Sequence, residues 1–423
     1  MAVVSEAIFD PGNEAHPDWA ALQDELAARA VRFGCAHTRE IRMRLAKAGV
    51  RPEDVGGVDG LAAIPVLEKD DLPGLQSERP PFGGMLARRA EALKRIYRSP
   101  GPINDPEGDR GDFWRVAPAA WAAGFRAGDV VLNSFSYHLT PGGLMLDAGL
   151  RALGCTVIPG GVGNSAAQVE IARAAGATGY AGTPQFLLAL LERDRETGRG
   201  ALFRRALVTG APLPPALRAR LQDEFGVDVR QSYGTADAGT LGYECEAKDG
   251  WHVAPEIVIE VLVPGGDRPA PEGEAGQVVV TSPNEVYPLV RFGTGDLSAW
   301  NREPCACGRT SHRLAGFLGR VGEGVKVRGM FVHPRELAGA LAGDPKVARY
   351  QAVVTEDAGG GDVFTVRVEA APGCRLGDDE VGALGARIRE AVKVRPVVEA
   401  VGAGEIAPDA EVVVDGRGGR TLT

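Results

Sequence analysis

A regular alternation of strand-like and helix-like segments between residues 130 and 233 constrains the fold of this chain more than any other feature. The expected strands cover 130–135, 155–161, 178–183, 205–210 and 227–233, and the expected helices cover 142–154, 165–176, 184–196 and 214–226. This order predicts a parallel sheet that is covered by helices on both faces. Because such sheets bind ligands at the carboxyl ends of their strands, the loops after these strands are the first candidates for a site.

The rest of the chain follows other patterns. Apolar residues at helical spacing within 19–50 predict amphipathic packing helices, and Pro and Gly then interrupt the chain up to Gly101. After Gly250, short alternating segments joined by Gly/Pro turns predict antiparallel strands, in a small barrel or sheet subdomain. Beyond Gly319 the pattern predicts a compact α+β unit of about 100 residues, a normal size for a separate domain.

Composition and charge exclude several classes of protein. The chain has 423 residues, enough for about two or three domains. Its 47 basic and 56 acidic residues give a net charge of −9, which is unfavourable for nucleic-acid binding. The sequence has no apolar run of about 18 residues and no secretory signal pattern, and its six cysteines do not form a disulfide framework. These observations predict a cytoplasmic, multi-domain protein that binds neither nucleic acid nor membranes.

Three Gly-containing turns carry charged residues that could contact a ligand. Residues 233–237 would present a carboxylate to Mg²⁺ between phosphates, and residues 291–296 would present an Asp to the hydroxyls of a ribose. Residues 319–324 have three glycines beside an Arg, as in an interdomain hinge with a guanidinium near a phosphate. Taken alone, these turns are better explained as ordinary turns or a linker.

Two short clusters contain Cys245, His252, Cys305 and Cys307. Four such residues suit a closed, structural zinc site with tetrahedral geometry. Unpaired surface and core cysteines are an equally good explanation from the spacing alone.

Taken together and in order, nine motifs resemble the phenylacetate–CoA ligase family of adenylate-forming enzymes. They are IPVLEKDDL, SYHLTPGGLM, PGGVGNSAAQ, GTPQF, GAPLPP, YGTAD…EC, YPLVRFGTGDL, CACGRT and LGRVGEGVKVRGMFVHPREL. The resemblance covers most of the chain. It implies an adenylate-forming α/β fold: a large N-terminal acyl- and nucleotide-binding domain (1–318) with parallel sheets and a small antiparallel barrel-like subdomain, a hinge (319–323), and a mobile α+β C-terminal domain (324–423).

The resemblance also implies the reaction and its partners. An aromatic carboxylic acid would react with ATP to give an acyl-adenylate and pyrophosphate, and coenzyme A would then displace AMP, as in aromatic acid metabolism. Adenylation supplies the good leaving group that a carboxylate lacks, and Mg²⁺ and cations would stabilise the charge. The sequence does not identify the acid, and it leaves the oligomeric state open, a homodimer included.

Site residues follow from the same resemblance. Asp237 and Arg320 would be catalytic, at the Mg²⁺-linked carboxylate and near the α-phosphate. The nucleotide would contact Gly210, Ala211, Tyr233, Gly234, Thr235, Asp237, Asp296 and Arg320. The acyl pocket would contain Phe135, Tyr137, His138, Gly161 and Asn164, and Gly329 would line the CoA channel. Cys245, His252, Cys305 and Cys307 match positions that can bind structural zinc.

The chain departs from the family pattern at several phosphate-contacting positions. Residues 98–108 contain prolines and acids where the family has a Ser/Thr/Gly-rich loop that ends near a Lys. Ala236 stands where the family has a hydroxyl, and Gly322 stands where it has a carboxylate. No Lys follows Lys393, although the family has a C-terminal lysine. An alternative is therefore a degenerate homologue that binds an acyl group, adenylate or CoA without efficient ATP-dependent activation. A third is an enzyme of the second half-reaction only.

Overall fold

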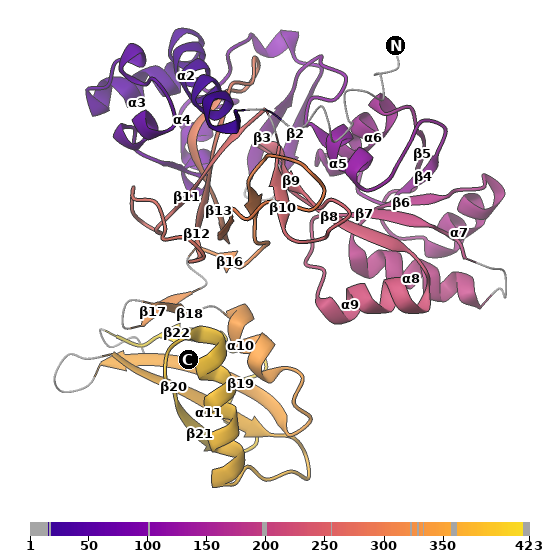
Figure 1. The fold of residues 1–423 in the computed structure, drawn as a ribbon, viewed down its shortest axis with the longest axis vertical. Coiled ribbons are helices and arrows are strands. Elements are labelled where there is room, and N and C mark those ends of the chain that lie inside the picture. The colour runs from indigo at the N-terminus through magenta and orange to yellow at the C-terminus, as the bar shows by residue number, and fades with distance from the viewer. Residues whose placement is uncertain are drawn as a thin grey trace. The chain divides into compact units, whose positions relative to one another are not determined.

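The computed structural model describes residues 16, 18–99, 102–196, 201–254, 256–321, 324–327, 330–332, 334–356 and 362–417. The chain divides into two compact units (Figure 1). The larger contains Met1–Gly295 and Ala299–Gly316, and the smaller contains Asp296–Ser298 and Phe317–Thr423. No helix among the described residues is both long and apolar enough to cross a membrane.

The expected alternation forms one half of a nine-stranded sheet with the order β14-β15-β10-β9-β8-β7-β6-β4-β5. Strands β5, β4, β6, β7 and β8 are parallel neighbours, as predicted. The elements of this half are β4 (Val130–Asn133), α6 (Gly142–Ala152), β5 (Thr156–Pro159), α7 (Ser165–Ala174), β6 (Gly179–Gly182), α8 (Pro184–Arg195), β7 (Arg205–Val208), α9 (Pro215–Ala219), η6 (Arg220–Glu224) and β8 (Asp228–Thr235).

Side chains on alternate faces of these strands enter two separate hydrophobic cores. Val131 and Leu207 pack with α5 (Val116–Ala122) and α6, whereas Leu132 and Val208 pack with α7 and α8. Both faces of the central parallel strands β4, β6 and β7 are therefore buried, which explains their apolar sequences.

The other half of this sheet is antiparallel and was not predicted. It contains β9 (Gly239–Tyr243), β10 (Trp251–Val253), β14 (Trp300–Asn301) and β15 (Arg313–Leu314). These strands have two to five residues, which is too short for an alternation pattern to be recognised. The hairpin of β2 (Arg95–Ser99) and β3 (Ile103–Glu107) was also missed, because Pro106 interrupts the pattern of β3.

A second sheet joins the N-terminal region to the segment after Gly250. Its order is β1-β13-β12-β11, and β16 pairs with the end of β13. The strands are β1 (Leu67–Glu68), β11 (Val258–Leu262), β12 (Gly276–Ser282), β13 (Leu289–Ser298) and β16 (Gly319–Arg320). The described strands form an open sheet, so the expected barrel-like closure is corrected to a sheet.

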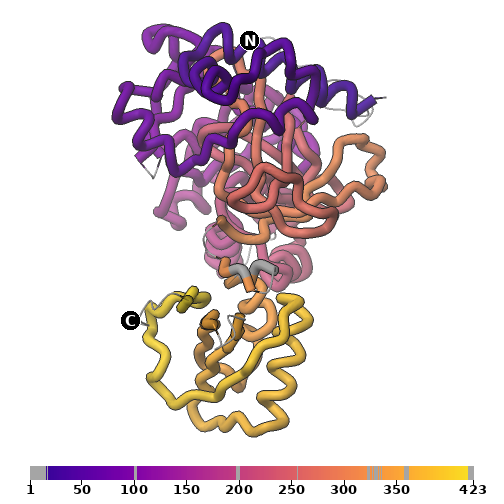
Figure 2. Tube along the Cα trace, turned by 90° about the vertical axis from the view of Figure 1, so that its left-hand side faces the viewer, coloured from indigo at the N-terminus to yellow at the C-terminus, as the bar shows by residue number. Residues whose placement is uncertain are grey.

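N-terminal helices cover this second sheet (Figures 1 and 2). Helix α2 (Trp19–His37) begins at Asp18, whose carboxylate accepts a hydrogen bond of 2.9 Å from the Ala21 amide, and packs on β11 and β12. The remaining elements of the region are α3 (Arg39–Ala48), η2 (Pro52–Asp54), η3 (Asp59–Ala63), η4 (Lys69–Asp71), α4 (Leu72–Glu78) and η5 (Ala90–Ala92).

The smaller unit has a four-stranded sheet with the order β21-β20-β19-β22 and its own core. Phe364 and Val366 of β20 pack in this core with Leu384 and Ile388 of α11. The elements are β17 (Val325–Val327), β18 (Met330–Val332), α10 (Pro334–Leu341), β19 (Val347–Glu356), β20 (Asp362–Ala370), α11 (Asp378–Val392), β21 (Val397–Val401) and β22 (Val413–Asp415).

A fully buried arginine in β13 ties the second sheet together. The Arg291 side chain has 0% exposure and lies 3.0 Å from the Glu260 carboxylate of β11. It also donates a hydrogen bond of 2.7 Å to the carbonyl oxygen of Ile64. The arginine of the YPLVRFGTGDL motif is therefore part of the packed interior of the larger unit.

We predict that Arg291→Met lowers the free energy of unfolding of the larger unit by about 3–5 kcal/mol, because it leaves the Glu260 carboxylate unpaired. All five tryptophans belong to this unit, so urea unfolding followed by tryptophan fluorescence measures its stability. The control Arg51→Met removes an exposed partner of Asp54 and should cost less than about 0.5 kcal/mol. Equal losses in the two variants would contradict this role of Arg291.

Candidate active site

A pocket of about 240 Å³ lies at the carboxyl ends of the parallel strands, where sequence reasoning placed the site. It combines loops after β4 and β7 with the end of β8. Its walls are Ser99, Val116, Phe135, Thr140, Pro141, Gly142, Met145, Leu146, Thr209, Gly210, Ser232, Tyr233, Gly234, Thr235, Ala236 and Thr240. The predicted residues Phe135, Gly210, Tyr233, Gly234 and Thr235 are thus brought together.

Close packing explains the glycines of this pocket. A side chain at Gly210, where φ is +71°, would begin 2.7 Å from the Cζ atom of Phe135. At Gly234 it would begin 2.6 Å from the carbonyl oxygen of Gly239 on the neighbouring strand. The pocket therefore exposes backbone at both positions, which suits the close approach of a flat ring.

Tyr233 forms an aromatic wall between the pocket and the sheet. Its ring stacks on Trp251 with centroids 5.1 Å apart, and its hydroxyl donates to the Thr294 hydroxyl at 3.3 Å. These contacts fix the ring and hold it in a single orientation.

Five other predicted residues are not part of the pocket wall. Ala211 is half-buried and follows Gly210, and His138 is exposed. The Tyr137 hydroxyl accepts a hydrogen bond of 2.8 Å from Asn133, and burial raises its pKa. The Gly161 amide donates to the Asn133 carbonyl at 3.1 Å, and Asn164 has a left-handed backbone at the start of α7.

Asp237 does not face the pocket. Its side chain has 0% exposure, and one carboxylate oxygen lies 2.7 Å from the Lys69 ammonium. Its other oxygen and both oxygens of Asp105 are buried with no hydrogen-bond partner in the described part of the chain. Burial, followed by repulsion from Asp237, raises the pKa of Asp105 to about 7. The charge of Lys69 thus acts on two buried carboxyl groups, those of Asp237 and Asp105.

Sequence reasoning missed Lys69 and Asp105 as site residues. Lys69 belongs to IPVLEKDDL, which contributed to the family resemblance but carried no assigned role. Asp105 lies in the unpredicted strand β3, so nothing in the linear pattern placed it beside Asp237.

Asp296 and Arg320 form an ion pair. The Arg320 Nε atom lies 3.2 Å from an oxygen of Asp296, and the two residues are opposite each other in the β13–β16 pairing. The Asp296 side chain is 11% exposed and that of Arg320 is 65% exposed. Arg320 therefore presents a charge to solvent beside a largely buried carboxylate. Gly329, the predicted CoA-channel residue, and Gly322 and Glu323 of the predicted hinge lie outside the described residues.

The four predicted metal ligands are neighbours in space. Ligand atoms of Cys245, His252, Cys305 and Cys307 all lie within 4.8 Å of one another. Cys245 follows β9, His252 is in β10, and the other two lie between β14 and β15. The His252 Nδ1 atom is 3.0 Å from the Ser311 hydroxyl, which leaves Nε2 facing the cluster, 3.3 Å from the sulfur of Cys307. Burial lowers the pKa of His252 to about 4, so this imidazole is neutral at pH 7.

We predict that Asp105→Asn stabilises the larger unit by about 2–4 kcal/mol at pH 8 and by a smaller amount, about 1–2 kcal/mol, at pH 5. Between about pH 4 and 7 the folded protein keeps a proton on Asp105 that the unfolded chain has lost, so its stability falls as the pH rises. An asparagine does not titrate. Urea unfolding at both pH values measures the difference.

The control for this prediction is Asp109→Asn, an exposed position just after the same hairpin. It should change the free energy of unfolding by less than about 0.5 kcal/mol at either pH. An equal gain from Asp105→Asn at pH 5 and pH 8 would show that the buried carboxyl group does not titrate as described.

Comparison with known proteins agrees with this geometry. The family model described as AMP-binding enzyme matches residues 113–287. A phenylacetate–coenzyme A ligase of Thermus thermophilus is 31% identical over 364 residues, which cover 82% of this chain and 81% of the relative. A phenylacetate–coenzyme A ligase of Aromatoleum evansii is 30% identical over 376 residues, which cover 84% and 83%.

Solved structures share the fold. An open conformation of 2-hydroxyisobutyryl-CoA ligase, solved with its acyl-adenylate and CoA, superposes with a TM-score of 0.86 at 24% identity, covering 96% of this chain and 94% of the other. This similarity establishes an adenylate-forming ligase fold. With the sequence relatives, it shows that the chain belongs to the phenylacetate–coenzyme A ligase family of AMP-forming acid–thiol ligases.

Proposed function

We propose that the protein joins a small aromatic carboxylic acid to coenzyme A through an acyl-adenylate. The observation that carries this proposal is the pocket at the carboxyl ends of the parallel strands. Its volume of about 240 Å³ is below the roughly 300–1,000 Å³ of typical ligand pockets, which favours a compact acid over a long acyl chain. Phe135, Met145 and Leu146 supply an apolar wall that suits an aromatic ring.

The nucleotide would use the polar and backbone side of the same pocket. Exposed backbone at Gly210 and Gly234 and the fixed ring of Tyr233 suit an adenine, with Ala211 and Thr235 beside them. The carboxylate of Asp296 would accept hydrogen bonds from the ribose hydroxyls, as in the family pattern. Arg320 would stabilise the α-phosphate. Its guanidinium is exposed and would exchange its contact with Asp296 for a contact with the phosphate.

The reaction would have two displacement steps. A carboxylate oxygen attacks the α-phosphorus of ATP, and pyrophosphate leaves with Mg²⁺ balancing its charge. The sulfur of CoA then attacks the acyl carbon and AMP leaves. Because Lys69 holds Asp237 in a buried pair, Asp237 would organise the loop 233–237. Bound Mg²⁺ would supply positive charge to the phosphates. The smaller unit would turn about the hinge 319–323 between the steps.

We expect ATP-dependent formation of phenylacetyl-CoA or a related aryl-CoA, with one pyrophosphate and one AMP released per thioester. Phe135→Ala should lower kcat/KM for the aryl acid about 10- to 100-fold, since losing a large apolar contact in a pocket costs roughly 1–3 kcal/mol. His138→Ala is the control, because His138 is exposed and does not line the pocket.

Separate half-reactions distinguish the alternatives. If no aryl acid releases pyrophosphate but a synthetic aryl-adenylate and CoA give a thioester, the protein catalyses only the second step. If AMP binds and neither step proceeds, the protein is the degenerate homologue. If Phe135→Ala and His138→Ala lower kcat/KM of an active enzyme equally, the proposal that the acid binds in this pocket is wrong.

We also propose that Cys245, His252, Cys305 and Cys307 hold a structural zinc ion. Tetrahedral zinc with Zn–S bonds of about 2.3 Å separates its sulfurs by roughly 3.7 Å. The sulfurs of Cys245 and Cys305 are 3.6 Å apart, which fits this geometry. The contact of His252 with Ser311 would orient the ring, as outer partners of zinc-binding histidines commonly do.

The zinc proposal predicts about one equivalent of zinc in protein purified without a metal-affinity column. Cys305→Ser should lower the zinc content severalfold and also the melting temperature, because the ion would join the β14–β15 segment to β9 and β10. Cys374→Ser, an exposed cysteine of the smaller unit, should change neither. Elemental analysis and thermal unfolding provide the readouts. Less than a tenth of an equivalent in the unaltered protein would refute the site.

A further inference from the structure

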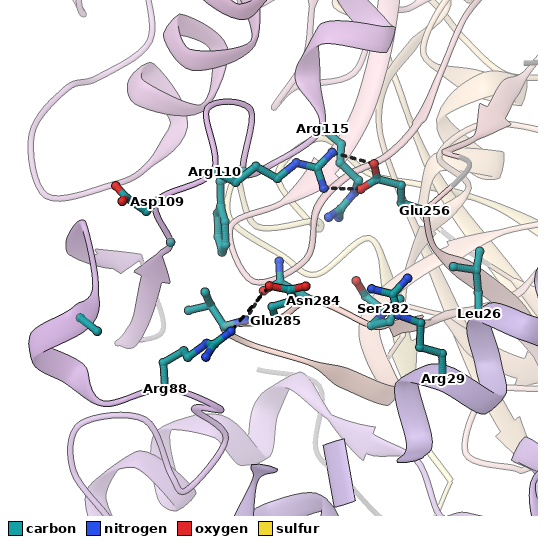
Figure 3. Close-up of a pocket in the computed structure, with 15 residues that line it drawn as sticks. Leu26, Arg29, Arg88, Asp109, Arg110, Arg115, Glu256, Ser282, Asn284 and Glu285 are labelled. Atoms are coloured by element: carbon teal, nitrogen blue, oxygen red, sulfur yellow. Dashed lines mark hydrogen bonds and ion pairs between the residues drawn. The ribbon is translucent and has the colours of Figure 1, made fainter. Parts of the chain in front are cut away.

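A second, larger cavity lies elsewhere in the larger unit and takes no part in the proposed reaction. Its volume is about 780 Å³ (Figure 3). Its walls come from α2, from the segment between β3 and α5, and from the turn between β12 and β13. We call it the arginine cavity, because four of its lining residues are Arg29, Arg88, Arg110 and Arg115.

Arginines outnumber acidic residues among the residues that line the arginine cavity. Three acidic residues, Asp109, Glu256 and Glu285, line it beside the four arginines. Glu256 pairs with Arg110 at 2.6 Å, and Glu285 lies 3.6 Å from Arg88. Figure 3 shows these two pairs, with Arg29 and Ser282 on one side of the view and Asp109 on the other.

The Glu256 carboxylate interacts with several guanidinium groups. Burial opposes ionisation of Glu256, but hydrogen bonds from Arg110 and the charges of Arg110, Arg115 and Arg29 hold its pKa below the usual value. Arg110 engages both oxygens of Glu256, at 2.7 and 2.6 Å. Burial lowers the pKa of Arg115, and the charges of Glu256 and Asp112 act in the opposite direction.

Arg115 is the most constrained of these residues. It is 5% exposed, and its Nε atom is buried with no hydrogen-bond partner in the described part of the chain. One of its terminal nitrogens donates to the carbonyl oxygen of Ala238. Its backbone is left-handed, with φ of +60°, which is costly for a long side chain. A buried charge with an unused donor is unfavourable unless a ligand pairs with it.

We propose that the arginine cavity binds an organic oxyanion, a carboxylate or a phosphate ester with an apolar body, through Arg115 and Arg29. Guanidinium groups suit such ligands because their planar donors match two oxygens at once. Leu26, Phe113 and Val286 line the same cavity and would contact the apolar part. This site is separate from the catalytic pocket and does not depend on the proposed function.

Titration calorimetry with phenyl phosphate and with phenylacetate tests the proposal and distinguishes the two kinds of oxyanion. At least one probe should bind saturably, and its affinity should fall tenfold or more in Arg115→Met and at least threefold in Arg29→Gln. The control is Arg32→Gln, because Arg32 is exposed on the same helix but does not line the cavity. Arg32→Gln should leave the affinity within twofold.

Further measurements separate this site from the catalytic pocket. Binding of the probe should persist at saturating AMP. If phenylacetate binds in the acyl pocket instead, Arg29→Gln should leave its affinity unchanged. Because Arg115 also contacts Ala238, its substitution could disturb folding, so the exposed Arg29 provides an independent test. The proposal is overturned if neither probe binds, if AMP excludes the probe completely, or if Arg29→Gln and Arg32→Gln have equal effects.

Discussion

Burial of the parallel strands on both faces is the constraint on which the candidate active site depends. Adjacent residues such as Val131 and Leu132 enter different cores, so neither face of the sheet can carry a polar site. The loops that follow the strands can carry polar and flexible residues, and the carboxyl ends of parallel strands lie at one edge of the sheet. The loops after β4 and β7 and the end of β8 meet there, although long stretches of sequence separate them.

Electrostatics beside this pocket differ from what a triphosphate would require. Lys69 pairs with Asp237, while Asp105 from the β2–β3 hairpin adds a second buried carboxyl group. The hairpin therefore carries an acid close to the loop 233–237, where a phosphate-binding segment would place donors. Protonation of Asp105 reduces this repulsion, because burial raises its pKa to about 7. Activation of the acid would then depend on cations from elsewhere, among which Arg320 is exposed beside Asp296.

The sequence predicted the elements that have strong periodicity and missed those that depend on distant partners. Every strand and helix from β4 to β8 follows from apolar runs and helical spacing, because both faces of those strands are buried. The short strands β9, β10, β14 and β15 acquire their structure from pairing with one another, which no local pattern encodes. The motif residues Gly210, Tyr233 and Phe135 meet as expected. The contact of Asp237 with Lys69 spans 168 positions and could not be read from spacing.

The start of α5 lies between the arginine cavity and the candidate pocket. Arg115 lines the arginine cavity, and the next residue, Val116, lines the candidate pocket at the carboxyl ends of the parallel strands. Arg115 has a left-handed backbone and directly precedes the first residue of α5. Asp112 supports the start of α5, because its carboxylate accepts hydrogen bonds from the amides of Val116 and Ala117 at 2.9 and 2.8 Å. Arg115 in turn holds the carbonyl oxygen of Ala238, one residue beyond the loop 233–237. A ligand that pairs with Arg115 would therefore act on a side chain whose hydrogen bond to Ala238 lies directly beside the loop 233–237.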